Sequence, residues 1–338
     1  MIVDAHLDLA WNALRGRDVT RPAAEQPSRP NEIATVGLPD LRAGGVGLIC
    51  GTIFIAPETY TNGDGGPDFA RAKHLAIQQL LWYLEQQQAG RLRVVETVAD
   101  LPTSPPGADK PLPTVLLLEG ADCIHSSEDV QDLWDVGLRA VGLAWRKTRH
   151  AGGTNEPGPI TPSGARLVRD LTSFGMIHDA SHLAEESFWN LADLTPGPIM
   201  ASHSNCARIV GEDPKAVGRH LTDRMIAEIA RRDGIVGINL FDRFLLPAAE
   251  YGKRRATLDD VVRHIDHVCQ VAGNAAHVGI GTDMDGGLGR DQCPEGIETS
   301  ADLPKLTEAL IEAGFSQDDA FDISGGNWLR FFRDYLPV

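Results

Sequence analysis

The chain has 338 residues, of which 42% are hydrophobic and 23% charged, and its formal net charge is −16. This apolar content can form a large core, which excludes an intrinsically disordered chain and a small disulfide-stabilised scaffold. The acidic excess repels phosphate backbones, so we expect no nucleic-acid partner.

Short apolar runs rich in Val and Ile recur along the chain and predict β-strands. In chain order they are Met1–Ala5, Gly47–Ile55, Thr114–Leu118, Leu138–Leu143, Met176–Ala180, Pro198–Ala201, Gly234–Leu240 and His277–Thr282. The runs are almost continuously hydrophobic, which is typical of parallel strands that are covered on both faces.

Helical patterns separate most of these runs. Apolar residues recur at helical spacing in Asp68–Gly90, Leu221–Arg232 begins with a Thr-Asp capping signal, and Leu258–Gly273 follows Thr257 in the same way. Strand–helix alternation over eight runs predicts an α/β protein with a (β/α)8 TIM barrel, and we expect residues 1–338 to form one domain. The alternative is an open doubly wound sheet, although no GxGxxG turn follows the first run.

Acidic and imidazole side chains follow five of the predicted strands. In a (β/α)8 barrel the functional groups gather at the C-terminal ends of the strands. The groups found there are His6 and Asp8 after the first run, Glu119 after the third, His182 after the fifth, His203 after the sixth, and Asp283 after the eighth with Asp285 just beyond. Residues two apart on a strand point the same way, so His6 and Asp8 are a ready pair of ligands for a divalent cation.

Each of these residues alone has a simpler explanation. A histidine after a strand is often only hydrogen-bonded, and an acid there is often a helix N-cap. The coincidence of three histidines and three acids at one predicted mouth is what indicates a metal site. Two ions fit this set better than one, because a carboxylate can bridge a pair of ions about 3.5–4 Å apart.

Other histidines are expected to be structural. His178 has the same strand parity as His182 but lies a layer deeper, so we expect a buried, hydrogen-bonded core residue. His264 and His267 fall on a predicted outer helix and are expected to face solvent.

The sequence shows no sign of export or membrane insertion. No apolar run is long enough to span a bilayer, so we expect no membrane partner. The start MIVDAHLDLA lacks the basic residues and the uninterrupted apolar stretch of a secretory signal. Five cysteines, an odd number without a CxxC pair, fit reduced thiols. We therefore expect a cytoplasmic protein.

Several segments of the chain resemble, in order, the membrane dipeptidase (renal dipeptidase) family, a branch of the metal-dependent amidohydrolase barrels. They are DAHLD, LLLEGAD, GMIHDASHLAEESFW, PIMASHSNCARI, GIVGINL, HVGIGTDMDGG and GGNWLRFF. The resemblance runs from about residue 2 to residue 333. Several motifs at consistent spacing make it highly specific, whereas HxD alone would be weak.

The resemblance implies a binuclear zinc enzyme that cleaves dipeptides, often with a D-residue on the C-terminal side, by a metal-bridging hydroxide. It assigns two Zn²⁺ per chain to His6 and Asp8 on one side and His182 and His203 on the other, with Glu119 as the bridge. The substrate partner would be a small dipeptide, and a homodimer is suggested by the family alone.

The resemblance also implies two residues that act on the substrate. Asp283 matches the family's acid/base residue at the end of the eighth strand. The segment GRHLTDRM matches the region that carries the family's carboxylate-binding arginine, which places it at Arg219.

One segment departs from the family pattern. Well-studied members carry a substrate-facing histidine after the fourth strand, where this chain reads GLAWRKTRH and has Trp145. Arg146 or His150 could replace that histidine, or the metals alone could suffice, and the loop 146–164 is expected to shape the pocket. The departure leaves a second function open, a metal-dependent hydrolase of another small amide such as an N-acyl amino acid or a lactam. A non-catalytic binding protein is a third, less favoured because it would not need Asp283.

Overall fold

The computed structural model describes residues 1–29, 32–62, 66–107 and 109–338. Its strands are β1 (Ile2–Leu7), β2 (Val46–Phe54), β3 (Leu92–Val94), β4 (Leu112–Glu119), β5 (Leu138–Gly142), β6 (Ile177–Asp179), β7 (Ile199–Ala201), β8 (Ile235–Ile238) and β9 (Val278–Ile280). All their pairings are parallel, in the order β2-β1-β9-β8-β7-β6-β5-β4, and β2 also pairs with β4. The pairing of β2 with β4 closes the sheet, so the predicted (β/α)8 barrel is confirmed and the open doubly wound sheet is excluded.

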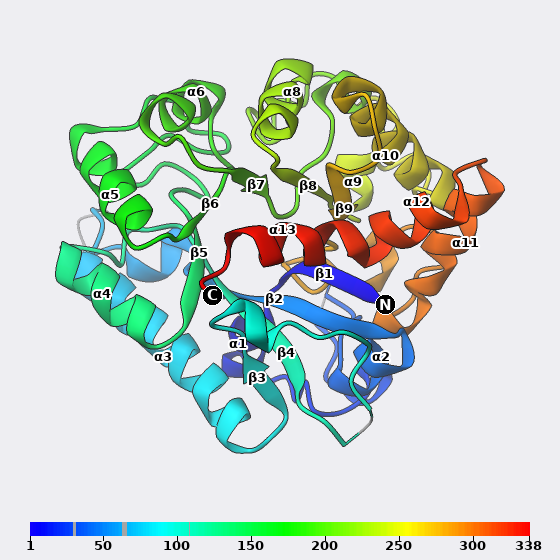
Figure 1. Ribbon diagram of the computed structural model, residues 1–338, viewed down its shortest axis with the longest axis horizontal. Helices are drawn as coiled ribbons and strands as arrows, with labels where there is room; N and C mark the ends of the chain where they lie inside the picture. The colour runs from blue at the N-terminus through cyan, green and yellow to red at the C-terminus, as the bar shows by residue number, and fades with distance from the viewer. Residues whose placement is uncertain (30–31, 63–65, 108) are drawn as a thin grey trace.

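Helices surround the barrel, except that α13 crosses the middle of the ring (Figure 1). They are α1 (Leu9–Leu14), α2 (Leu38–Ala43), α3 (Phe69–Gln88), α4 (Ser127–Asp135), α5 (Pro162–Ser173), α6 (Glu185–Leu194), α7 (Ala207–Val210), α8 (Asp223–Arg231), α9 (Asp242–Leu245), α10 (Leu258–Ala272), α11 (Pro304–Glu312), α12 (Gln317–Phe321) and α13 (Asn327–Tyr335). The three helices predicted from the sequence are α3, α8 and α10. Each of these helices begins directly after a capping residue. The side chains of Asp68 and Thr222 accept hydrogen bonds from backbone N–H groups of the first turn, and Thr257 forms a capping box.

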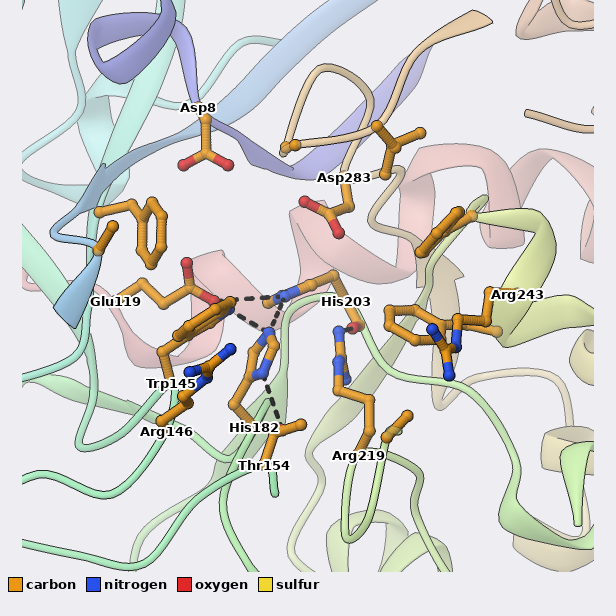
Figure 2. A pocket seen from close by; sticks show the side chains of 18 of the residues that line it. Asp8, Glu119, Trp145, Arg146, Thr154, His182, His203, Arg219, Arg243 and Asp283 are labelled. Carbon is orange, nitrogen blue, oxygen red and sulfur yellow. Dashed lines mark hydrogen bonds and ion pairs between the residues drawn. The ribbon is translucent and has the colours of Figure 1, made fainter. Parts of the chain in front are cut away.

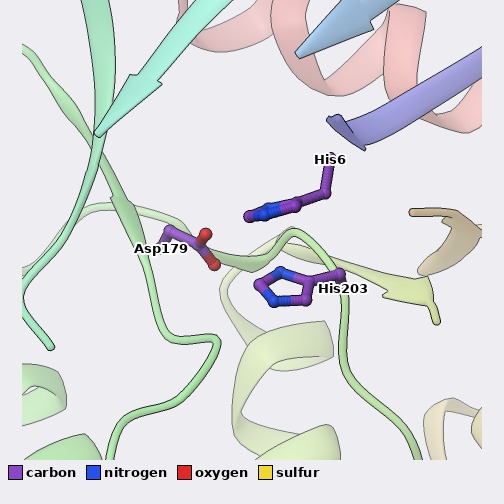
Figure 3. Close-up of side chains that lie close together, drawn as sticks. All are labelled: His6, Asp179 and His203. Carbon is purple, nitrogen blue, oxygen red and sulfur yellow. The ribbon is translucent and has the colours of Figure 1, made fainter. Parts of the chain in front are cut away.

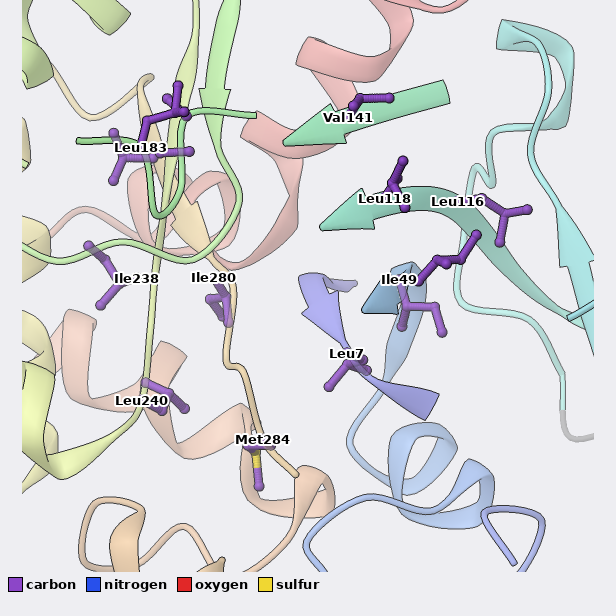
Figure 4. Close-up of a cluster of buried hydrophobic side chains, with 14 of the residues drawn as sticks. Leu7, Ile49, Leu116, Leu118, Val141, Leu183, Ile238, Leu240, Ile280 and Met284 are labelled. Carbon is purple, nitrogen blue, oxygen red and sulfur yellow. The ribbon is translucent and has the colours of Figure 1, made fainter. Parts of the chain in front are cut away.

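The hydrophobic core has two layers. The outer layer fills the space between strands and helices and includes Leu116 and Leu118 of β4 (Figure 4). The inner layer fills the barrel itself and includes Val115 and Leu117 of the same strand. Because side chains alternate along a strand, Glu119 continues the inward series and faces the barrel interior at its C-terminal end.

Helix α13 closes the N-terminal end of the barrel, and it crosses the middle of the ring in Figure 1. Trp328 of this helix is fully buried, and its indole Nε1–H donates to the Ile280 carbonyl at 2.9 Å. Glycine is required beneath it, since a Cβ at Gly279 would lie 2.4 Å from Trp328 Nε1. With this end packed, a substrate can enter only at the opposite, C-terminal mouth.

The structure overturns one expectation about a histidine, confirms another and adds one strand. His264 is fully buried, with Nε2 near the Leu245 carbonyl at 3.1 Å, so the prediction that it faces solvent was wrong. His178 is buried and hydrogen-bonded to Thr172 as predicted, but it points outward from β6 towards α5. Strand β3, which the sequence did not indicate, pairs only with the start of β4.

Among the described residues, no helix is long and apolar enough to cross a membrane.

Candidate metal centre

The predicted site residues converge at the C-terminal mouth of the barrel, around a cavity of about 460 Å³ (Figure 2). The acids and imidazoles among them lie at or just after the ends of β1, β4, β6, β7 and β9, and Trp145 follows β5. The predicted residues that line the cavity are Asp8, Glu119, Trp145, His182, His203, Arg219 and Asp283. His6 lies immediately beneath, with Nε2 3.8 Å from Glu119 Oε2.

Three of these side chains form a compact triangle of ligand atoms. Glu119 Oε1 lies 3.2 Å from His182 Nε2 and 3.4 Å from His203 Nε2, and the two nitrogens are 3.0 Å apart. Tetrahedral zinc with bonds of about 2.0–2.1 Å separates its ligands by about 3.3 Å. The triangle therefore has the dimensions of one face of a zinc coordination tetrahedron.

The second oxygen of the same carboxylate faces a different pair of ligands. His6 Nε2 lies 3.8 Å from Glu119 Oε2 and 4.0 Å from Asp8 Oδ2. These separations are wider, so the side chains would have to move slightly inward around an ion. Asp283 also belongs to a compact group with His6 and Asp8. The carboxylate of Glu119 thus lies between two candidate cation sites.

The hydrogen-bonding state of these residues fits metal ions. His6 Nε2, Asp8 Oδ1 and Glu119 Oε1 are buried without a hydrogen-bond partner, which is costly unless a cation satisfies them. The opposite ring nitrogens do have partners, because His182 Nδ1 lies 2.9 Å from Thr154 Oγ1 and His203 Nδ1 lies 2.8 Å from a serine hydroxyl. Imidazoles that bind metals through one nitrogen are held in the same way through the other.

The electrostatics of the protein alone are unfavourable to the charged forms of these groups. Burial raises the pKa of both Asp8 and Glu119 well above their usual range. The neighbouring carboxyl of Asp283 adds to this effect on Asp8, and the carboxyl of Asp8 adds to it on Glu119. Burial and the charge of Arg219 lower the pKa of His6 to about 3, so its imidazole is neutral and can offer a lone pair. A divalent cation would favour the ionised carboxylates without disturbing the neutral rings.

Two of the site residues have left-handed backbone conformations, which are uncommon outside glycine. These are His182, with φ 67°, and Asp283, with φ 59°. Asn239 Nδ2 donates to Asp283 Oδ2 at 2.8 Å and fixes the orientation of the carboxyl group. Asp285, also left-handed, is turned away from the cavity and forms an ion pair with Arg17 at 2.8 Å.

Arg219 brings a positive charge to the cavity without a carboxylate partner. Its side chain is buried, and its guanidinium donates to Ser204 Oγ at 3.2 Å and to the His203 carbonyl, while Nε has no partner. Among the described residues, no carboxylate lies within ion-pair distance of this guanidinium. A buried charge of this kind is costly unless it is paired, so the site is suited to an anionic group of a substrate.

The structure separates Trp145 from His150. Trp145 lines the cavity, with its ring centroid 5.9 Å from that of His182, and Arg146 lines the cavity beside it. His150 does not line the cavity, because the chain turns after Arg146 and places the ring near the Ile124 carbonyl at 3.3 Å. The structure therefore does not bring His150 to this cavity, and the loop 146–164 reaches it through Arg146, Thr154 and Asn155.

Sequence reasoning missed the residues that hold the ligands in place. These are Thr154, Asp179, Ser202 and Asn239, which hydrogen-bond to the ligand rings, to Asp283 or to each other. One signal was present, since the fifth and sixth runs both end in Ala and are both followed by Ser-His. The serine before each histidine follows the inward parity of its strand.

A (β/α)8 barrel that gathers buried imidazoles and carboxylates at its C-terminal mouth has the arrangement of a metal-dependent barrel enzyme. The family model of the membrane dipeptidases, peptidase family M19, matches residues 1–336. The chain therefore belongs to the membrane dipeptidase family and is a metal-dependent dipeptidase, which confirms the resemblance found in its motifs.

Similar proteins agree with this assignment. The chain is 30% identical over 267 residues to the uncharacterised protein in the pqqA 5′ region of Klebsiella pneumoniae, covering 75% of this chain and 93% of that protein. It is 32% identical to an uncharacterised dipeptidase of Schizosaccharomyces pombe, over 64% of this chain but only 51% of that longer protein.

Solved structures extend the similarity to the whole chain. The metallopeptidase of family M19 called dipeptidase AC has a TM-score of 0.82 at 26% identity, covering 100% of this chain and 99% of that one. A metallopeptidase from Rhodobacter sphaeroides, liganded with a phosphinate mimic of the dipeptide L-Ala-D-Ala, has a TM-score of 0.80 at 26% identity and covers 99% of both chains.

Proposed function

We propose that this protein hydrolyses the peptide bond of dipeptides, including those with a C-terminal D-residue, and that it does so with two zinc ions. The proposed ligands are His6, Asp8, Glu119, His182 and His203. Membership of the dipeptidase family supports the reaction, and the dipeptide mimic bound to the Rhodobacter sphaeroides relative supports the substrate class.

One observation carries the two-ion proposal. The two oxygens of Glu119 face different ligand pairs, at 3.2 and 3.4 Å on one side and 3.8 Å on the other. A single ion would use one of these groups and leave the other buried without a counter-charge. Two ions bound there would polarise the scissile carbonyl and provide a hydroxide nucleophile near neutral pH.

The chain's own residues would do the remaining work. Arg219 would bind the free C-terminal carboxylate of the substrate, since its buried guanidinium faces the cavity without an acidic partner. Asp283 would accept a proton from the attacking water and return it to the leaving amine, because it lines the cavity close to Asp8 and is oriented by Asn239.

The remaining expectations concern the chain as a whole. We propose that residues 1–338 act as one catalytic domain, since both the family match and the barrel extend over nearly all of it. The homodimer and the cytoplasmic location stay predictions.

A second substrate class is favoured by one position. Trp145 occupies the place of the family's substrate-facing histidine and cannot supply its charged hydrogen bond. Its ring lies 5.3 Å from that of Phe54 and gives the pocket an apolar wall on this side. Such a wall would suit the acyl chain of an N-acyl amino acid, whose free carboxylate Arg219 could still bind.

A hydrolysis screen separates these two functions. The zinc-loaded protein would be assayed with L,L- and L,D-dipeptides beside N-acyl amino acids and lactams, and release of the amino product would be measured. The dipeptidase proposal predicts the highest kcat/KM for a dipeptide with a free carboxylate. Preferential cleavage of an N-acyl amino acid would instead establish the second function.

A further inference from the structure

A third group of potential ligands lies beneath the two candidate metal sites. It consists of His6, Asp179 and His203, drawn in Figure 3. All three side chains are buried, and their ligand atoms lie within 4.8 Å of one another. By composition alone this group resembles another cation site.

The hydroxyl of Ser202 already fills the position between these three side chains. Its Oγ lies 2.6 Å from Asp179 Oδ2, 2.8 Å from His203 Nδ1 and 3.2 Å from His6 Nδ1. The group is therefore a hydrogen-bonded layer centred on Ser202.

The direction of each hydrogen bond in this layer follows from counting donors. A hydroxyl has one hydrogen and two lone pairs. An ionised Asp179 can only accept, and its other oxygen already accepts from the backbone N–H groups of Ser181 and Ser202, each at 2.9 Å. The hydrogen of Ser202 therefore goes to Asp179, and its two lone pairs face the two imidazoles.

This arrangement determines the tautomer of both rings. His6 and His203 must each carry their proton on Nδ1 to donate to Ser202 Oγ, which leaves the lone pair on Nε2. The rings are tightly packed, with centroids 3.6 Å apart, so neither can turn independently. The two Nε2 atoms are the ones that face Glu119, through its different oxygens.

The backbone around Ser202 is held just as closely. A Cβ at Gly237 would lie 2.1 Å from the Ser202 carbonyl oxygen, and one at Gly281 would lie 1.7 Å from it. Strand β8 and the segment just after β9 thus pack directly against the backbone of Ser202, while the hydrogen bonds to Asp179, His203 and His6 hold its hydroxyl.

We propose that Ser202 is a positioning residue whose single hydroxyl sets the tautomer and ring orientation of one histidine in each metal site, so that the affinities for both ions depend on it. This inference rests on the proposed two-metal function. It also explains why the acid and two imidazoles below the site are not themselves a cation site.

The test is to measure the binding of zinc alone to variants, by competition with a chelator. Ser202→Ala should lower the affinity for each of the two zinc ions by about 10- to 100-fold, as is usual when the hydrogen-bond partner of a metal-binding imidazole is removed. Asp179→Asn should weaken binding too, because an amide can donate to Ser202 and force its hydrogen onto a ring nitrogen.

Two further variants make the comparison specific. Thr154→Val removes the hydroxyl beside His182 Nδ1 and should weaken the binding of only one of the two ions. Thr172→Val removes the hydroxyl beside His178, a buried histidine that is not a proposed ligand, and should weaken the binding of neither ion. Wild-type affinity in Ser202→Ala, or the loss of only one ion, would overturn the proposal.

A second measurement needs no variant. In metal-free protein labelled with ¹⁵N-histidine, NMR should show His6 and His203 protonated at Nδ1, and an Nε2–H tautomer in either ring would overturn the proposal. The two failures can be distinguished. A wild-type protein that binds no zinc contradicts the proposed function, whereas two bound ions that are insensitive to Ser202→Ala contradict only the role of the serine.

Discussion

The role proposed for Asp283 is to move protons rather than to bind substrate. Its carboxyl lines the cavity, and burial raises its pKa to about 7, while Arg219 and the hydrogen bond from Asn239 lower it. Asp283→Asn preserves the shape but removes the base, so kcat should fall by a factor on the order of 10² or more, with a smaller change in KM. Steady-state kinetics beside metal analysis check this, and an unchanged kcat in the zinc-loaded variant would exclude the proton-transfer role.

Arg219 should act on binding instead. A charge-assisted pair with a substrate carboxylate is worth about 1.5–3 kcal/mol, so Arg219→Ala should raise KM and lower kcat/KM by about 10- to 150-fold. The loss should nearly vanish for C-terminally amidated dipeptides. Arg224→Ala, which removes an exposed arginine outside the cavity, is the matched control. An equal loss for free and amidated substrates would rule out the carboxylate role.

At the residue scale, strand parity predicted the direction of some side chains correctly and of others wrongly. Glu119 follows a long regular strand, so its inward direction could be predicted from the alternation in β4. His182 lies beyond the end of β6 in a left-handed turn, so counting back to His178 gave the wrong face. His264 lies three residues after Val261 and four before Val268, a helical spacing that indicates the buried face of α10 and was overlooked.

At the element scale, the start of α10 depends on one carboxylate. Asp260 accepts from the Thr257 backbone N–H at 2.9 Å, which completes a capping box, and from two Arg254 nitrogens at 2.6 and 2.9 Å. Burial opposes ionisation, but these hydrogen bonds lower the pKa of Asp260 to about 2. The stabilisation is therefore present above the unfolded pKa of about 3.9 and is lost as the pH falls towards 2.

Replacing this carboxylate should have a pH-dependent effect on folding. Asp260→Ala should cost about 1–2 kcal/mol at pH 7, as expected for a lost cap, and lower the Tm. The Tm difference from wild type should narrow between pH 4 and pH 2. Thermal unfolding of both proteins in excess chelator measures this without interference from metals, and Asp259→Ala tests an exposed carboxylate of the same helical turn. A difference independent of pH would contradict the assigned ionisation.

Element prediction succeeded where the pattern was local. All eight predicted runs became barrel strands, since a continuous apolar run between turn residues reports burial on both faces. Strand β3 was missed because Arg93 lies between its two apolar residues, so the strand does not show a continuous apolar run. The close contact between Trp328 of α13 and Gly279 of β9 could not be predicted either, because the two residues are far apart in the sequence and no local pattern connects them.

At the scale of the whole molecule, the two ends of the barrel are built differently. Aromatic residues of α13 fill the N-terminal end, while charged and imidazole groups from five strands share the C-terminal mouth. The packed end confines substrate access to the mouth, where burial strengthens electrostatic interactions with metal ions and substrate.

The most direct test of the proposed activity is a zinc titration of metal-free protein, followed by the rate of hydrolysis of its best dipeptide substrate. Because Glu119 faces two ligand pairs, the rate should rise with added zinc and reach its plateau at two equivalents per chain. A plateau at one equivalent, or no hydrolysis at two, would contradict the two-zinc dipeptidase.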